Sequence, residues 1–403
     1  MRLRRFMRVK STGRGIGVRL MMRFLYICGY DQGISDMRRL IFMVAAVIAC
    51  VTSYAQDRAD RQDLTDPGSS TFILFGDPQG YVKYDINQPI FELTTLWVAD
   101  NVEHLNIKAV LCTGDLVEQN ENNALNRNML NQSSVQMWES ISCSLERIDN
   151  KVPFISCGGN HDYGFQRSEN YNTEYPKYIS FERNRTYVDC LKAEFHNRLG
   201  HASLENAAFE FEMPGWKHKI LVISSEFAPS AEAVEWARKL VTSDKYKDDY
   251  VVYITHSYLD EKTAKYTENE GYWVTKQEGN HSGKMLWENL VSKVPNIRLV
   301  ICGHTGRPSP SKNIEEDNEL STAYRVDKNI AGKNVHQMMF NVQTLGGGWE
   351  GNGGDGWIRI LEFMPDGKTI KVRTYSPLFG ISPSTKHLAH RTAPYDQFDM
   401  VVE

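Results

Sequence analysis

Three polar residues follow one another at the end of a short apolar run near the middle of the chain. The run covers residues 152–157 and stops at two glycines, which indicates a buried strand that delivers a loop. The loop then presents Asn160, His161 and Asp162 in consecutive positions. An amide oxygen can bind a metal ion, which leaves the adjacent imidazole free to serve a reacting group. The triplet is therefore a candidate for metal-assisted chemistry.

Other strand-like runs also end in side chains that can bind a metal ion. Residues 71–75 precede Asp77 and Gln79, residues 109–112 precede Asp115, residues 250–254 precede His256, and residues 298–302 precede His304. For any one of these residues, a turn, a helix cap or a hydrogen-bonded structural histidine is the simpler interpretation. In an open α/β sheet, however, the carboxyl ends of the strands share an edge where ligands bind. Five such endings in this order favour a single metal site.

Helical segments separate these strand-like runs. Apolar residues recur at helical spacing over residues 88–105, which predicts a helix after the first strand. Further helices are expected at 133–148, 231–241 and 284–294, and further strands at 206–213, 219–225, 335–342, 356–363 and 371–375. The alternation predicts an α/β fold with a parallel or mixed sheet.

The order and spacing of the five endings resemble the calcineurin-like metallophosphoesterases. Their blocks run Asp-x-His, Gly-Asp, Gly-Asn-His-Asp/Glu, His and Gly-His-x-His, and the resemblance spans about residues 71–306. The sequence is more similar still to an exported bacterial branch that has Asp-x-Gln in the first block. The similarity includes residues 224–227, 255–259, the glycine-rich stretch 346–354 and residues 372–377, so it reaches about residue 377. The resemblance implies a sandwich of two mixed β-sheets with helices outside.

The resemblance also implies two divalent metal ions (Mn, Fe, Zn or Mg). Their ligands would be Asp77, Gln79, Asp115, Asn160, His256 and His304. Asp115 would bridge the two ions, Asp77 and Gln79 would serve the first, and the remaining three would complete the second. Two ions about 3.5–4 Å apart supply a hydroxide at neutral pH and neutralise the oxygens of a phosphoryl group.

By the same resemblance, His161 would act on the substrate rather than bind metal. It would donate a proton to the leaving oxygen or stabilise the phosphoryl charge, and Asp162 would orient it. Gln343, Trp349 and Trp357 lie around the glycine-rich stretch and are weaker candidates for substrate contacts. Ordinary packing in a hairpin explains the two tryptophans equally well.

Two positions depart from the family pattern, and both affect the first metal position. Gln79 replaces a histidine, and Gly306 stands where the last block has its second histidine. Oxygen donors would then dominate this position, which predicts weaker binding and a preference for harder ions such as Mn²⁺ or Mg²⁺. Glu118 and His281 are candidate substitute ligands.

The N-terminal residues have the features of an export signal. Residues 37–55 combine a basic start, a short apolar run and small residues before Gln56, which is typical of a signal peptide. Residues 1–36 are then interpreted as an over-extended start, and residues 56–70 as a linker. Alternatively, Cys50 is the acylated cysteine of a lipoprotein. Either way the mature protein is expected to be periplasmic or extracellular, without a transmembrane helix.

Charge argues against long polyanionic partners. The first 55 residues hold ten Lys or Arg and two acids, so the remainder carries a formal charge of −12 where the whole chain has −4. An acidic body disfavours non-specific binding to nucleic acid or anionic membranes. A small phosphorylated substrate remains compatible.

These observations together predict an exported metal-dependent phosphoesterase. It would hydrolyse phosphomonoesters or phosphodiesters by attack of metal-bound hydroxide. The catalytic domain is expected at residues 71–380, with an insertion at 163–204 that caps the site and a C-terminal tail at 381–403. A nuclease or nucleotidase is the closest enzymatic alternative. The other alternative, motivated by Gln79 and Gly306, is a degenerate domain that binds a phosphorylated or sugar ligand without turnover.

Overall fold

The computed structural model describes residues 62–124 and 130–402. The predicted start segment 1–36, the signal peptide 37–55 with Cys50, and residues 56–61 of the predicted linker lie outside the described residues. Among the helices of the described part, none is long and apolar enough to cross a membrane.

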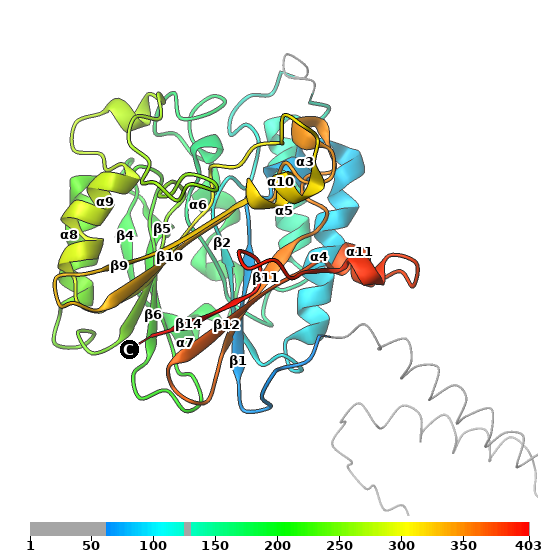
Figure 1. The fold of residues 1–403 in the computed structure, drawn as a ribbon. Coiled ribbons are helices and arrows are strands. Elements are labelled where there is room, and N and C mark those ends of the chain that lie inside the picture. Colours follow the sequence, from blue (N-terminus) through cyan, green and yellow to red (C-terminus); the bar gives the residue numbers. More distant parts are fainter. Residues whose placement is uncertain (1–61, 125–129, 403) are drawn as a thin grey trace, which may run out of the picture. The chain divides into compact units, whose positions relative to one another are not determined.

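Two mixed β-sheets form the centre of the fold (Figure 1). The first sheet has the order β13 (His390–Arg391), β12 (Thr369–Tyr375), β11 (Ile358–Phe363), β1 (Ser70–Phe75), β2 (Ile107–Cys112) and β3 (Phe154–Ser156), and β14 (Phe398–Val401) also pairs with β12. The second has the order β4 (Leu191–His196), β5 (Ala202–Phe211), β6 (Ile220–Ser224), β7 (Tyr250–Ile254), β8 (Ile297–Cys302), β10 (Asn334–Phe340) and β9 (Thr322–Lys328). Strands β1, β2 and β3 run parallel, as do β6, β7, β8 and β10.

Helices cover the outer faces of both sheets. The longer ones are α4 (Gln88–Asn101), α5 (Ser134–Leu145), α8 (Ala231–Val241) and α9 (Gly283–Asn289), and the shorter ones are α3 (Gln79–Val82), α6 (Tyr175–Tyr178), α7 (Tyr187–Cys190), α10 (Ile314–Glu319) and α11 (Pro377–Gly380). In Figure 1, α8 and α9 lie beside the second sheet, and α4 lies on the opposite side of the molecule, beside the first. This arrangement confirms the predicted α/β class with two mixed sheets and flanking helices.

Serine caps explain where several of these helices begin. Ser133 and Gln136 form a reciprocal capping box at the start of α5. The side chain of Ser230 accepts a hydrogen bond from the backbone N–H of Ala233, and Ser282 caps α9 in the same way. Each cap satisfies a backbone donor that has no partner within the helix.

Two buried clusters hold the layers together. One cluster fills the space between the sheets and includes Phe72 from β1, Leu361 from β11 and Ile301 from β8. The other includes Leu221 from β6 and Val234 from α8, on the outer face of the second sheet. The central parallel strands are therefore buried on both faces, which explains why they are continuous apolar runs in the sequence.

The edges of the second sheet differ from the sequence-based expectation. The segment 307–333, in which no helix or strand was predicted, contains α10 and β9, and the last part of the 163–204 insertion supplies β4 and the start of β5. Both β4 and β9 are terminal strands of the sheet order and are only partly buried. An edge strand with a solvated face needs no apolar run, so its sequence resembles that of a loop.

Candidate metal centre

The loops after β1, β2, β3, β7 and β8 meet at one end of the sheets. Two of the predicted ligands have backbone conformations in the left-handed region, with φ of +50° at Asp115 and +68° at His304. Such values are uncommon for residues other than glycine and occur most often at functional sites. A side chain at Gly159 would place its Cβ 2.2 Å from the backbone nitrogen of Asp115. The glycine before Asn160 is therefore required for the two loops to pack together.

Four side chains predicted to hold the second metal converge on one point. The Oδ1 atom of Asn160 lies 2.9 Å from Nε2 of His256 and 2.8 Å from Nδ1 of His304. The two ring nitrogens are 3.0 Å apart, and Oδ2 of Asp115 lies 3.2 Å from Nε2 of His256. The side chains of Asp115, Asn160 and His256 are all buried.

Hydrogen bonds on the far sides of the rings indicate which nitrogens hold lone pairs. Nδ1 of His256 lies 2.7 Å from the carbonyl oxygen of Thr113, and Nε2 of His304 lies 2.9 Å from Oε1 of Glu270. Each of these nitrogens carries a hydrogen when it donates to its oxygen, so in the neutral rings Nε2 of His256 and Nδ1 of His304 would face the centre as acceptors. Four acceptor atoms facing one another repel unless a positive charge lies between them. The donor set fits a divalent cation.

The pKa shifts of His256 and Asp115 also indicate that this centre favours a positive charge. Burial alone would lower the pKa of His256, but the carboxylates of Asp115 and Asp77 raise it to about 10. Burial opposes the ionisation of Asp115, yet His256 and His161 hold its pKa below the usual range. Because the pKa of His256 is raised, in the absence of an ion its ring retains a proton at the place where a cation would fit.

The predicted first metal position is rich in oxygen donors. The Oε1 atom of Gln79 is buried and has no hydrogen-bond partner among the residues that the structure describes. Asp77 accepts hydrogen bonds from Thr113 Oγ1 at 2.6 Å and from the backbone N–H of His304 at 2.8 Å. Burial raises the pKa of Asp77 to about 6. A buried amide oxygen without a partner and a buried carboxylate two residues away in sequence are both donors that a hard metal ion could use.

The structure also shows what takes the space beside Gly306. A Cβ added to Gly306 would lie 3.6 Å from Cγ of Asn341, and φ at Gly306 is +140°, which other residues rarely adopt. The buried Asn341 side chain donates a hydrogen bond of 2.7 Å to Oδ2 of Asp77. Asn341 thus supports the Asp77 carboxylate from the side of Gly306.

Of the two suggested substitute ligands, His281 has other contacts, and Glu118 contacts the His161 ring through its backbone carbonyl rather than its carboxylate. Nδ1 of His281 faces the carbonyl oxygens of Pro229 and Gly279, at 3.3 and 3.1 Å. The carbonyl oxygen of Glu118 lies 2.7 Å from Nδ1 of His161. The metal-competent group found among the described residues consists of Asp115, His256 and His304.

His161 lies beside the centre without joining its donor set. Its backbone N–H donates to Oδ1 of Asp115 at 2.8 Å, and its ring is held through Nδ1 by the carbonyl of Glu118. With the hydrogen on Nδ1, the other ring nitrogen, Nε2, is left available to a substrate.

The expectation that Asp162 orients the His161 ring is corrected by the hydrogen bonds. The carboxylate of Asp162 accepts from the backbone N–H groups of Leu116 at 2.8 Å, Val117 at 3.2 Å and Gly159 at 2.8 Å. Three backbone donors occupy both oxygens, so Asp162 joins the Asp115 loop to the Asn160 loop. Its effect on His161 is indirect, through the placement of these loops.

The structure adds one residue that sequence reasoning missed. Glu270 accepts from Nε2 of His304 and, at 2.6 Å, from the hydroxyl of Ser257. Burial would raise the pKa of Glu270, but His304 holds it below its usual value. A carboxylate behind a ligating histidine fixes the ring orientation and increases its basicity. Nothing in the polar segment around Glu270 distinguishes it from neighbouring acids such as Glu268.

Removing Glu270 should weaken metal binding. We expect Glu270→Ala to lower the affinity of the second position by about 10–100-fold, the usual effect of losing such a partner. Glu270→Gln can still accept the hydrogen bond and should recover part of the loss. Competition with a chelator measures the affinity. Glu268→Ala is the matched control, because Glu268 is 55% exposed and pairs with Lys284. An unchanged affinity in Glu270→Ala would contradict this role.

The candidate substrate residues occupy different surroundings. Trp349 is 48% exposed, within a short 3₁₀ turn at Gly348–Glu350. Gln343 is buried, and its backbone N–H donates to Oδ1 of Asn341 at 3.1 Å. Trp357 packs against Phe379 with ring centroids 5.5 Å apart. Trp357 lines a cavity whose wall contains none of the six predicted ligands.

The fold is that of a metallophosphoesterase, and the converging side chains could hold a divalent cation. Comparison with known families agrees. A model of the calcineurin-like phosphoesterase family matches residues 70–308. The chain belongs to this family, which confirms the resemblance seen in the sequence.

Individual relatives are distant. An uncharacterized protein, YvnB of Bacillus subtilis, is 25% identical over 314 residues, which are 76% of this chain and 20% of that protein. The chain thus spans about a fifth of the length of this curated relative.

The solved structures that match this chain are more distant still in sequence. GAP50, the anchor in the inner membrane complex of Plasmodium, has a TM-score of 0.41 and 11% identity, with 83% of this chain and 89% of that one covered. A 5'-nucleotidase precursor from Thermus thermophilus has a TM-score of 0.40 and 15% identity, with coverage of 76% and 54%. Likenesses at this level bear on neither the site nor the substrate.

Proposed function

We propose that this protein hydrolyses phosphate esters at a metal centre formed by Asp77, Gln79, Asp115, Asn160, His256 and His304. The strongest support is that four acceptor atoms converge through contacts of 2.8–3.2 Å in a buried site. The chain that forms this site belongs to a phosphoesterase family. When bound, divalent ions lower the pKa of water and neutralise charge on phosphoryl oxygens.

In this proposal, each side chain of the site has a separate role. The carboxylate of Asp115 would hold both ions, and its Oδ1 atom accepts a hydrogen bond from the backbone N–H of His161, which places that residue beside the centre. Nε2 of His161 holds the proton that passes to the leaving oxygen. The carbonyl of Glu118 retains the hydrogen on Nδ1 of His161, which keeps the ring in one orientation. Trp349, being exposed, is available to contact the organic part of a substrate.

The two metal positions should differ in affinity. The second has two imidazoles and an amide oxygen, whereas the first relies on Asp77, Gln79 and the shared Asp115. Because nitrogen donors bind borderline ions more tightly than neutral amide oxygens do, we propose one tightly held ion and one weaker, harder ion such as Mn²⁺ or Mg²⁺.

Export and substrate size complete the proposal. The basic and apolar pattern of residues 37–55 supports secretion to the periplasm or beyond, with acylation at Cys50 as the alternative. The acidic composition after residue 55 supports a small phosphorylated substrate rather than a long polynucleotide.

Metal content and turnover test the proposal together. We would measure metal per chain by elemental analysis of the full protein, and hydrolysis of 4-nitrophenyl phosphate and bis(4-nitrophenyl) phosphate with Mn²⁺ added. One tightly held ion, with activity that rises on addition of Mn²⁺, is the expected result. Two tightly held ions with turnover would support hydrolysis but overturn the weak first position. Bound metal without turnover of either ester would leave a binding domain and overturn the enzymatic proposal.

A further inference from the structure

A tyrosine that is not a predicted ligand packs against the metal centre. The ring of Tyr272 meets the ring of His304 edge-on, with centroids 5.7 Å apart, and lies 5.8 Å from the ring of Phe227. Phe227 in turn contacts the ring of His256, at 5.7 Å. Two aromatic side chains therefore cover one side of the two predicted imidazole ligands, and Tyr272 is the one that carries a polar group.

The hydroxyl of Tyr272 is open to solvent. The side chain is partly exposed, whereas Phe227 beside it is buried. The hydroxyl forms no hydrogen bond with any other residue that the structure describes, and it is not one of the buried polar atoms that lack a partner. Water, or a ligand group that displaces the water, can therefore reach this oxygen.

The same hydroxyl keeps its proton at neutral pH. Burial raises the pKa of Tyr272 to about 12, and the charge of Asp115 contributes to the rise, whereas the charge of Arg167 opposes it. A protonated phenol is a hydrogen-bond donor. Because such influences act over short distances, they agree with the ring contacts in placing this donor near the bridging carboxylate and near a guanidinium.

Hydrogen bonds hold the Tyr272 segment beside the loop that contains His161. The backbone N–H of Val274 donates to the carbonyl of Ser168 at 3.4 Å, and Oγ of Ser168 donates to the carbonyl of Asn160 at 2.8 Å. Glu270, two residues before Tyr272, binds a predicted ligand from the other side. The position of the tyrosine is therefore fixed relative to the metal centre.

Arg167 brings a positive charge to this side of the centre. It directly precedes Ser168 in the loop and is exposed. Its guanidinium pairs with no carboxylate in the described part of the chain. An unpaired arginine next to a protonated phenol is an arrangement that attracts an anionic group and donates to its oxygens.

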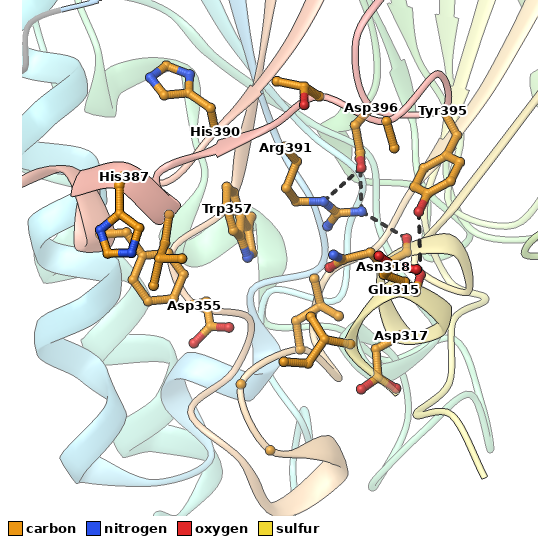
Figure 2. A pocket seen from close by; sticks show the side chains of 18 residues that line it. Glu315, Asp317, Asn318, Asp355, Trp357, His387, His390, Arg391, Tyr395 and Asp396 are labelled. Carbon is orange, nitrogen blue, oxygen red and sulfur yellow. Dashed lines mark hydrogen bonds and ion pairs between the residues drawn. The ribbon is translucent and has the colours of Figure 1, made fainter. Parts of the chain in front are cut away.

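The cavity beside the C-terminal tail is less suited to an anionic group. It has a volume of about 820 Å³, and Glu315, Asp317, Asp355 and Asp396 are among its lining residues. Figure 2 shows that the guanidinium of Arg391 in its wall is already bound to Asp396, with a hydrogen bond of 3.0 Å. The other carboxylates would repel a phosphate ester.

We propose that the hydroxyl of Tyr272 donates a hydrogen bond to an oxygen of the substrate's phosphoryl group. This inference rests on the proposed hydrolysis and adds a side chain that contacts the reacting group. The phenol would bind an oxygen that is not held by metal, and Arg167 would add positive charge for the same group. A donor placed in this way strengthens its hydrogen bond as negative charge develops on the phosphoryl oxygens.

Tyr272→Phe tests this contact, because it removes the hydroxyl and retains the ring against His304. In the metal-loaded full protein, kcat/KM for 4-nitrophenyl phosphate should fall by about tenfold or more, with unchanged metal content. Phenyl phosphate should slow by the same factor, because the two esters share the phosphoryl group. Tyr250→Phe is the matched control and should behave as the parent does. Tyr250 is also partly buried against a ring, that of Trp216, and it begins β7 at the end opposite His256.

Calorimetric titration with inorganic phosphate gives a second readout that needs no turnover. The metal-loaded parent and Tyr250→Phe should bind phosphate equally, and Tyr272→Phe should bind it several-fold more weakly. Arg167→Gln should also weaken binding, most clearly at low ionic strength.

Three results would overturn the role of Tyr272. They are an unchanged kcat/KM in Tyr272→Phe, a loss that differs between the two esters, and a phosphate affinity equal to that of the parent. A parent that binds phosphate but hydrolyses neither ester would overturn the proposed function instead. The phosphate titration would then still decide whether Tyr272 contacts the phosphoryl group.

Discussion

Asp115→Asn should remove the metal from the protein and reduce turnover of aryl phosphates by a factor on the order of 10³ or more. Asparagine tolerates the positive φ at this position and can still accept the hydrogen bond from the backbone of His161. The change therefore removes mainly the negative charge and one oxygen donor. Bound ions contribute several kcal/mol of charge stabilisation, and each ~1.4 kcal/mol corresponds to a tenfold change in rate. Elemental analysis and steady-state kinetics measure the two effects.

The control for this variant is an aspartate far from any predicted ligand. Asp244 has a side chain that is 99% exposed and pairs with Lys247, so Asp244→Asn should retain full metal content and activity. Thermal denaturation of each variant shows whether it is folded. If a folded Asp115→Asn protein retained the metal content of the parent, the bridging role of Asp115 would be wrong.

His161→Ala should separate turnover from metal binding. His161 contributes no atom to the cluster of acceptors, so metal content should stay at the level of the parent. Loss of a general acid typically costs 10²–10⁴-fold, so we expect turnover to fall by about that factor. The loss should be larger for phenyl phosphate than for 4-nitrophenyl phosphate, because the nitrophenolate leaves readily without a proton.

Comparison of the two leaving groups gives this variant its diagnostic value. If His161 only stabilised the charge of the phosphoryl group, both esters would slow by the same factor. Loss of metal in His161→Ala would show instead that the ring supports the ligands. Either result would contradict the role of proton donor.

The residues that end the central strands could be found from sequence because the relevant information is local. A parallel strand buried on both faces is an apolar run, and the polar side chains after it stand out. Asp77, Asp115, Asn160, His256 and His304 were each predicted in this way, and the structure brings them to one end of the sheets. The two-sheet fold followed from the family resemblance and is confirmed.

Elements at the edges of the sheets were less predictable. Residues 322–328 form β9 although their sequence resembles a polar loop. An edge strand exposes one face to water, so hydrogen bonds to β10 define it rather than an apolar pattern. Those bonds depend on a partner strand, which the composition of the segment does not reveal.

The supporting contacts of the site could be known only from the folded chain. Glu270 reaches His304 across 34 positions and Asn341 reaches Asp77 across 264, and neither residue belongs to a motif. The role of Asp162 was misjudged for the same reason, since its partners lie in the Asp115 loop. Strand order and residue type are encoded locally, and they were sufficient to predict candidate metal ligands, of which the structure brings Asp115, Asn160, His256 and His304 together. The packing of distant segments decides which side chain supports each predicted ligand. It also decides which cavity forms between α10 and residues 387–396.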